Sequence, residues 1–158
     1  MTPVPASASR VEMTQLVMPG QANNLGTGFG GTIMMWTDQC AGMAAMRHAR
    51  MPVVTISVDQ FTFLSPVRIG HFCILRGQVN AVFRTSLEVG VDVLTEDPHT
   101  GQQQLCCHAF LTFVAVGPER KPVPVPPLLV VSEEERHREE DAAKRRASRL
   151  ALREALRR

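Results

Sequence analysis

Residues 23–50 read NNLGTGFGGTIMMWTDQCAGMAAMRHAR, a glycine-rich turn that runs directly into a helix. The helix is expected from Thr32 to about Arg50, because basic residues fill its last turn and Pro52 follows. It is apolar on nearly every side and carries one carboxylate, Asp38. A long apolar helix must be covered, so this segment predicts a fold in which other elements wrap around it.

The rest of the folded region consists of runs with the apolar–polar alternation of strands. One short strand is expected at residues 11–17, and four more follow the helix at residues 53–64, 71–83, 86–95 and 103–116. One strand, one buried helix and a four-strand meander predict an α+β fold, a five-stranded antiparallel sheet curled around one long central helix. Such a sheet leaves an open edge and an uncovered helix flank, which dimerisation would cover.

The composition divides the chain into four segments. Residues 1–9, rich in Pro, Ser and Ala, are expected to be disordered, and residues 10–120 to form the folded domain. The segment KPVPVPP predicts a Pro-rich linker over residues 121–131. Residues 132–158 are expected to form a charged C-terminal helix that opens with a capping box at Ser132. This helix is expected to lie on the domain or on a partner subunit, and a basic surface for RNA or a membrane is the alternative.

The bulk composition narrows the classes of function. A formal net charge of +2 and an aromatic content of 5%, with no Tyr, argue against a nucleic-acid partner. The four cysteines show neither the spacing of a metal site nor a disulfide framework, and free thiols suit a cytoplasmic location. No apolar run approaches the roughly 20 residues that a membrane span requires.

The glycine turn is the first candidate for chemistry. Gly26, Gly28 and Gly31 match the GxGxxG pattern, but a dinucleotide site needs a strand directly before the glycines and a βαβ unit, and neither is expected here. Gly30 and Gly31 open the helix, where free backbone N–H groups can stabilise the negative charge that develops on a thioester or ester carbonyl. The alternative is a glycine-rich loop that is packed for steric reasons.

Asp38 is the second candidate, and its position matters. It lies seven residues after Gly31, which is about 10 Å along the helix axis, too far to serve a carbonyl held at the start of its own helix. A two-fold axis would bring Asp38 of a partner subunit towards that carbonyl, so the site is expected to be shared between subunits. Alternatively, Asp38 is a hydrogen-bonding group buried in an interface. Asn23 and Asn24 either orient a water molecule or the carbonyl, or are ordinary turn residues.

Other residues on the helix have structural readings. His48 is expected to cap the C-terminus of the helix. Four methionines either pack in the core or line an adaptable acyl groove: Met34, Met35, Met43 and Met46. Cys106 and Cys107 are expected to point to opposite faces of a strand, so a nucleophilic dyad is not supported.

Five motifs, in this order, resemble the hotdog-fold acyl-CoA thioesterases of the cytosolic long-chain acyl-CoA hydrolase type: NNLGTGFGG, WTDQCAGMAAMRHA, VVTISVDQFTFLSPVRIG, RTSLEVGVDV and AFLTFVAV. The resemblance covers about residues 11–124. It implies the hotdog fold, hydrolysis of acyl-CoA to a free fatty acid and coenzyme A, and a homodimer that often assembles into a hexamer. It implies no cofactor, because coenzyme A is part of the substrate. The alternative is a non-catalytic acyl-CoA-binding or interaction module of the same fold.

The resemblance also implies roles for particular residues. Asn23 is the family's asparagine, with Asn24 as the alternative amide, and Asp38 is the catalytic acid, acting as a general base or as a nucleophile. The glycine turn at Gly30 and Gly31 would hold the thioester carbonyl. The segment of Arg84, Thr85 and Ser86 corresponds to a region near bound coenzyme A, although Arg84 can also be a turn arginine in solvent. The turn contains no histidine, which favours hydrolysis over dehydration.

Overall fold

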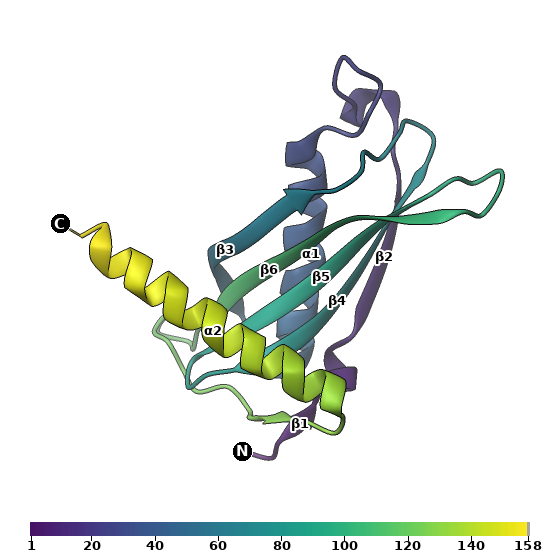
Figure 1. Cartoon of the computed structure of the whole chain (residues 1–158). Helices are drawn as coiled ribbons and strands as arrows, with labels where there is room; N and C mark the ends of the chain where they lie inside the picture. The colour runs from purple at the N-terminus through teal and green to yellow at the C-terminus, as the bar shows by residue number, and fades with distance from the viewer. Residues whose placement is uncertain (158) are drawn as a thin grey trace.

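The computed structural model describes residues 1–157 and contains a five-stranded antiparallel sheet that curls around one long helix (Figure 1). The order of the strands across the sheet is β2-β4-β5-β6-β3, so β2 and β3 form its two edges. The expected fold is therefore confirmed, and each strand ends within one residue of its expected limits. The bounds are β2 (Val11–Leu16), β3 (Val53–Phe63), β4 (Phe72–Val82), β5 (Ser86–Glu96) and β6 (Gln103–Ala115).

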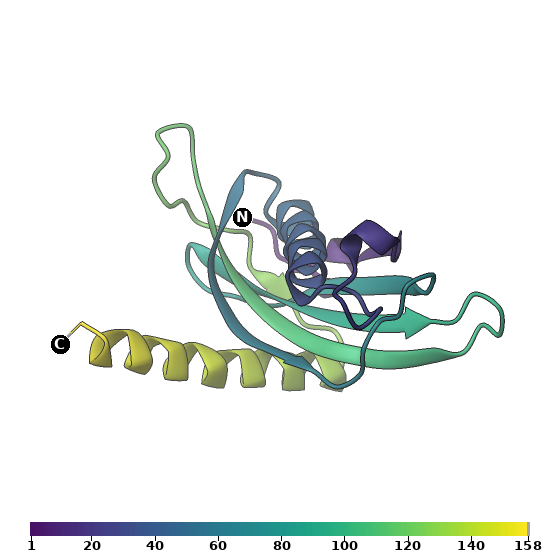
Figure 2. The ribbon, with the colours of Figure 1, turned by 90° about the horizontal axis from the view of Figure 1, so that it is seen from above.

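Helix α1 (Gly30–Ala49) lies on the concave face of the sheet (Figure 2). It begins two residues before the expected Thr32, because the carbonyl of Phe29 already accepts hydrogen bonds from the backbone N–H groups of Thr32 and Ile33. Small residues let the helix approach the sheet closely: a Cβ added at Gly77 of β4 would lie 3.1 Å from the sulfur of Cys40. The core lies between this face of α1 and the inward side chains of the sheet.

The N-terminal segment is ordered, so the expectation of a disordered tail at residues 1–9 is wrong. Strand β1 (Val4–Pro5) pairs with β7 (Leu128–Leu129), and the single turn η1 (Ala6–Ser9) follows. Ser9 is fully buried, and its hydroxyl accepts a hydrogen bond from the N–H of Val79 at 2.9 Å. Ser9 thus provides an acceptor for a backbone N–H of β4 that lies past the last residue paired with β2. Composition alone does not reveal this contact. A second short turn, η2 (Pro19–Gln21), lies between β2 and α1.

Residues 121–131 are docked under the C-terminal end of α1. Val125 is buried, and its N–H donates to the carbonyl of Arg84. The ring of His48 is fully buried, and its Nε2 donates to the carbonyl of Pro126 at 2.8 Å, while burial lowers the pKa of the imidazole. His48 therefore does not cap α1 as expected. The helix instead ends at Ala49, and the next residue, Arg50, takes a left-handed conformation (φ 56°) that stops it.

Helix α2 (Glu133–Ala155) crosses the convex face of the sheet, opposite α1 (Figures 1 and 2). Ser132 caps the helix, because its hydroxyl accepts a hydrogen bond from the N–H of Glu135. The carboxylate of Glu135 accepts in turn from the N–H of Val131, whereas in the expected capping box it would accept from the N–H of Ser132. Within residues 1–157, no helix combines the length and the apolar character that crossing a membrane requires.

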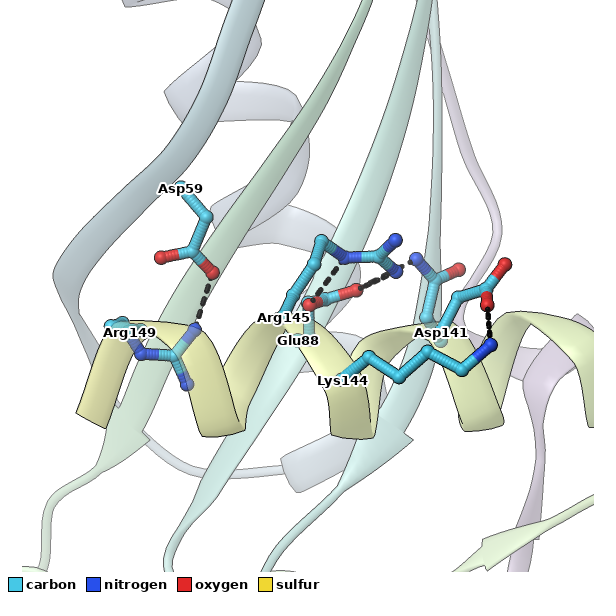
Figure 3. Close-up of polar contacts among 7 residues, drawn as sticks. Asp59, Glu88, Asp141, Lys144, Arg145 and Arg149 are labelled. Atoms are coloured by element: carbon cyan, nitrogen blue, oxygen red, sulfur yellow. Dashed lines mark hydrogen bonds and ion pairs between the residues drawn. The ribbon is translucent and has the colours of Figure 1, made fainter. Parts of the chain in front are cut away.

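Two ion pairs fix α2 to the sheet (Figure 3). Arg145 donates to both carboxylate oxygens of Glu88, at 3.0 and 2.7 Å, and its guanidinium lies 3.7 Å from the centroid of the Phe110 ring. Further along the helix, Arg149 pairs with Asp59 of β3. Glu88 is completely buried, so the helix covers a carboxylate that the sheet alone would leave in solvent.

Candidate active site

A cavity of about 350 Å³ lies at the N-terminal end of α1. Its walls come from the glycine turn, the first turn of α1, and residues 63–67, which are the last residue of β3 and the loop after it. The predicted residues Asn23 and Gly30 both line it. Most of the surface of the cavity is apolar, and the Asn23 amide and the start of the helix supply polar groups, as expected of a site that orients one polar group of a largely apolar ligand.

The side chain of Asn23 holds the glycine turn in place. Its Oδ1 accepts from the N–H groups of Leu25 and Thr27, at 2.9 and 3.2 Å, and its Nδ2 donates to the hydroxyl of Thr27 at 2.8 Å. An amide nitrogen carries two N–H groups, so a second donor remains in addition to that bond. Asn24 is exposed and does not line the cavity, which favours Asn23 as the working amide.

Gly30 and Gly31 are the first two residues of α1, so their N–H groups have no acceptor within the helix. The residue before them, Phe29, provides no side-chain cap. A Cβ added at Gly30 would meet the ring of Phe63 at 3.6 Å, an ordinary contact, whereas one at Gly31 would lie 2.9 Å from the ring of Phe29. Steric packing within the protomer therefore does not require glycine at Gly30, whose backbone is open to the cavity.

Asp38 is exposed and accepts a hydrogen bond from the hydroxyl of Thr55 on β3 at 2.8 Å. It does not line the cavity that contains Asn23 and Gly30. One protomer thus brings the asparagine and the glycine turn together and leaves the carboxylate apart. Thr55 could not be identified from its spacing in the sequence, because β3 has two register shifts against β6 and its residues do not alternate regularly between faces.

Asp38 lies in an exposed apolar surface formed by α1 and β3. Five large side chains on it are between 37 and 51% exposed: Met34, Met35, Met43, Met46 and Val58. The methionines therefore do not pack in the core of the protomer, which was one of the two expected roles. Exposed apolar side chains beside an edge strand whose outer side has no neighbour are typical of an interface. We refer to it as the α1–β3 surface.

The predicted coenzyme A segment is divided by the structure. The side chain of Arg84 is exposed and lines no cavity that contains its two neighbours. Thr85 and Ser86 line a separate cavity of about 610 Å³ between the convex face of the sheet and α2. Helix α2 and the residue after it contribute three arginines and three leucines to its lining: Arg146, Arg149, Arg153, Leu150, Leu152 and Leu156. The position of these arginines could not be predicted from the sequence, because it depends on where α2 packs against the sheet.

Cys40 and Cys73 are poorly suited to act as nucleophiles. All four cysteines are free and buried. Burial raises the pKa of Cys40 to about 11 and the pKa of Cys73 to about 12, so their thiolates are scarce near neutral pH. Within residues 1–157, no three His, Cys, Asp or Glu side chains are grouped as a metal site.

Comparisons with known proteins identify the family. A model described as "Thioesterase superfamily" matches residues 25–102. The uncharacterized acyl-CoA thioester hydrolase YkhA of Bacillus subtilis is 42% identical over 118 residues, which cover 75% of this chain and 69% of that protein. The chain belongs to the thioesterase superfamily. Acetyl-coenzyme A thioesterase of Mus musculus is 36% identical over 89% of this chain, and the chain spans only about a quarter of the length of that relative.

Two solved structures match this chain over nearly its whole length. A hexameric acyl-CoA thioesterase is 39% identical with a TM-score of 0.92, and the match covers 96% of this chain and 97% of that one. An acyl-CoA hydrolase of Staphylococcus aureus, in complex with butyryl coenzyme A and coenzyme A, is 32% identical with a TM-score of 0.91, over 98% and 94% of the two chains. Structures of that hydrolase also exist with alanine in place of an asparagine, an aspartate and a threonine.

Proposed function

We propose that this protein is an acyl-CoA thioesterase that hydrolyses acyl-CoA to a free fatty acid and coenzyme A. The observation that carries the proposal is the cavity at the start of α1, in which the Asn23 amide and the unsatisfied end of a helix face a largely apolar space. Its size suits the thioester end of an acyl chain. The N–H groups of Gly30 or Gly31 would stabilise the carbonyl oxygen as it becomes negative, and Asn23 would orient it.

The general base in this proposal is Asp38 of the partner subunit. It takes a proton from a water molecule, whose oxygen attacks the carbonyl carbon. The bond to sulfur then breaks, and the proton held by Asp38 passes to the departing sulfur, which releases coenzyme A and restores the carboxylate. Direct attack by the carboxylate, which would form an anhydride, is the alternative route. The exposed α1–β3 surface supports the shared arrangement, because pairing two such surfaces would bury the apolar side chains around Asp38 and bring this carboxylate towards a second protomer.

The relative from Staphylococcus aureus supports the choice of residues. Its altered asparagine, aspartate and threonine occur in the same order and at the same intervals as Asn23, Asp38 and Thr55. That set includes Thr55, which the geometry identifies as the hydrogen-bond donor to Asp38. The hexameric relatives support a dimer that assembles further.

Release of free thiol from a panel of acyl-CoA esters tests the proposed activity. We expect turnover by the unaltered protein, and we expect Asp38→Asn to lower kcat on the order of a hundredfold, because a general base is lost while the shape of the side chain is kept. Circular dichroism and thermal unfolding serve as the control that the variant is folded. Binding of acyl-CoA without thiol release at any chain length would contradict the proposal and favour a non-catalytic acyl-CoA-binding module.

A further inference from the structure

Cys106 and Cys107 lie in an irregular part of β6. Cys107 pairs with Val93 of β5, whereas Cys106 has no partner on that strand, because the register shifts at this point. Both side chains are fully buried in the core, and the thiol of Cys107 donates a hydrogen bond to the sulfur of Cys106. Neighbouring side chains of a regular strand cannot meet in this way, because they point to opposite faces. The expectation that the two cysteines point to opposite faces is therefore wrong.

This bulge supports one wall of the candidate active-site cavity. The thiol of Cys106 donates to the carbonyl of Ser65 at 2.9 Å, and the carbonyl of Cys106 accepts from the N–H of Leu64 at 2.7 Å. Ser65 and Leu64 both line the cavity. The same loop reaches the glycine turn, since the carbonyl of Val67 accepts from the N–H of Gly28 at 2.6 Å. A chemical change at Cys106 would therefore be transmitted to the cavity through a single loop.

Among the four buried thiols, that of Cys106 is the best suited to react. The hydrogen bond from Cys107 lowers the pKa of the Cys106 thiol, although burial acts in the opposite direction. Burial raises the pKa of Cys40 and of Cys73, and the hydrogen bond that Cys107 donates to Cys106 raises the pKa of Cys107. Since the thiolate is the form that attacks an electrophile, Cys106 has an advantage over the other three.

The surroundings of Cys106 restrict the electrophile to a small one. Its sulfur is inaccessible to solvent, and the loop at Ser65 separates it from the cavity. A bulky disulfide cannot approach through this loop, whereas hydrogen peroxide is little larger than water. Cys107 is a poor disulfide partner, because the Cα atoms of neighbouring residues are only about 3.8 Å apart and disulfides usually need about 4.4–6.8 Å. One equivalent of peroxide would therefore give a sulfenic acid and not a disulfide.

From these observations we infer that Cys106 is a peroxide-sensitive thiol that regulates the candidate active site. The inference rests on the proposed function as far as the regulated activity is concerned. The thiolate attacks one oxygen of hydrogen peroxide, the O–O bond breaks and hydroxide leaves, so that Cys106 is oxidised to a sulfenic acid and the peroxide is reduced. The added oxygen cannot fit between the sulfur and the Ser65 carbonyl oxygen, which are 2.9 Å apart, so the loop must move. Once it has moved, two equivalents of a thiol reductant restore the Cys106 thiol, with release of water and a disulfide.

Peptide mass mapping after peroxide treatment tests the modification. Catalase removes the oxidant, and the protein is then unfolded in the presence of dimedone, which labels sulfenic acids. We expect the label at Cys106 and not at Cys40 or Cys73. Cys107→Ala should slow the labelling about tenfold, because the hydrogen bond that favours the thiolate is lost. Cys107→Ser keeps a donor and should retain most of the rate, and Cys40→Ala is the matched control, since it removes a buried thiol of the same size from α1.

Turnover after the same treatment tests the regulation. We expect peroxide to lower kcat/KM for acyl-CoA about tenfold, because groups that position the thioester are displaced, and we expect dithiothreitol to restore it. Cys106→Ser keeps a donor to Ser65 and forms no sulfenic acid, so its kcat/KM should be the same with and without treatment. Absence of a label at Cys106, equal labelling of all four cysteines, or a labelled enzyme with unchanged kcat/KM would overturn the inference. If the protein releases no thiol from acyl-CoA, the proposed function fails, while the labelling still decides whether Cys106 is the reactive thiol.

Discussion

At the scale of single residues, the carboxylate of Asp38 is oriented by one hydroxyl from a neighbouring element. Thr55 donates to one oxygen of Asp38 and leaves the other available to a water molecule. Because Asp38 is exposed in the protomer, its side chain would otherwise be free to rotate. Thr55 is therefore a positioning residue in the proposed mechanism.

Thr55→Val keeps the shape of this side chain and removes the hydrogen bond. We expect kcat to fall about fivefold to tenfold with little change in KM, because one hydrogen bond to a carboxylate is lost from the base and not from the substrate. Thr55→Ser, which keeps the hydroxyl, is the matched control and should retain most of the activity. A valine variant with the kcat of the unaltered enzyme would remove Thr55 from the mechanism.

Asp38 could be predicted as a site residue from the sequence, whereas Thr55 could not, for a physical reason. A single carboxylate in a helix that is otherwise apolar is conspicuous without any structure. Thr55 lies in a strand whose two register shifts break the regular alternation, so its face cannot be inferred from the spacing. The direction of the Arg84 side chain could not be predicted from the sequence either. Its neighbours Thr85 and Ser86 line a cavity, whereas Arg84 is exposed and does not line it.

At the scale of elements, α2 is attached to the sheet through a buried ion pair. Glu88 is inaccessible to solvent, and it accepts from Asn80 as well as from Arg145 (Figure 3). Removing one member of such a pair leaves an uncompensated charge in the interior, which is far more costly than losing a surface ion pair. The position of α2, and of the arginines beyond it, depends on this contact.

Arg145→Met removes the charge and keeps much of the aliphatic stem. We expect it to lower the free energy of unfolding by about 3–5 kcal/mol, because Glu88 stays buried without its partner. Arg138→Met is the matched control: Arg138 pairs with Glu134 on the surface, and its loss should cost less than about 1 kcal/mol. Urea denaturation followed by circular dichroism measures both, and equal effects would show that the Glu88 pair does not anchor α2.

The elements themselves were largely predictable, and their contacts were not. The alternation Leu87, Val89, Val91, Val93 identifies β5 and its inward face, and all four residues are buried. Nothing in that alternation shows that a helix more than forty residues later covers Glu88 on the opposite face. Composition likewise suggested disorder for residues 1–9. The order of this segment could not be predicted from it, because the hydrogen bond from Val79 to Ser9 joins positions far apart in the chain.

At the scale of the whole molecule, the protomer is incomplete in two respects. The α1–β3 surface exposes apolar side chains at an edge strand whose outer side pairs with no other strand of residues 1–157. The cavity with Asn23 and Gly30 also lacks a carboxylate, and Asp38 lies in the exposed surface. A two-fold dimer through this surface would cover the exposed apolar side chains and would also bring a carboxylate to each cavity. This dimer is the central claim of the proposed mechanism.

Hybrid dimers test this claim most directly. Asn23→Ala and Asp38→Asn are each expected to be nearly inactive, and co-expression with two different tags allows the mixed dimers to be purified. If each site takes Asn23 from one subunit and Asp38 from the other, a mixed dimer contains one intact site and recovers about half of the unaltered activity. If both residues act within one subunit, every site in the mixed dimer is defective. Thiol release by the purified mixed dimer, at about half the unaltered rate, is the predicted result, and a rate no higher than that of the two parent variants would contradict the shared site.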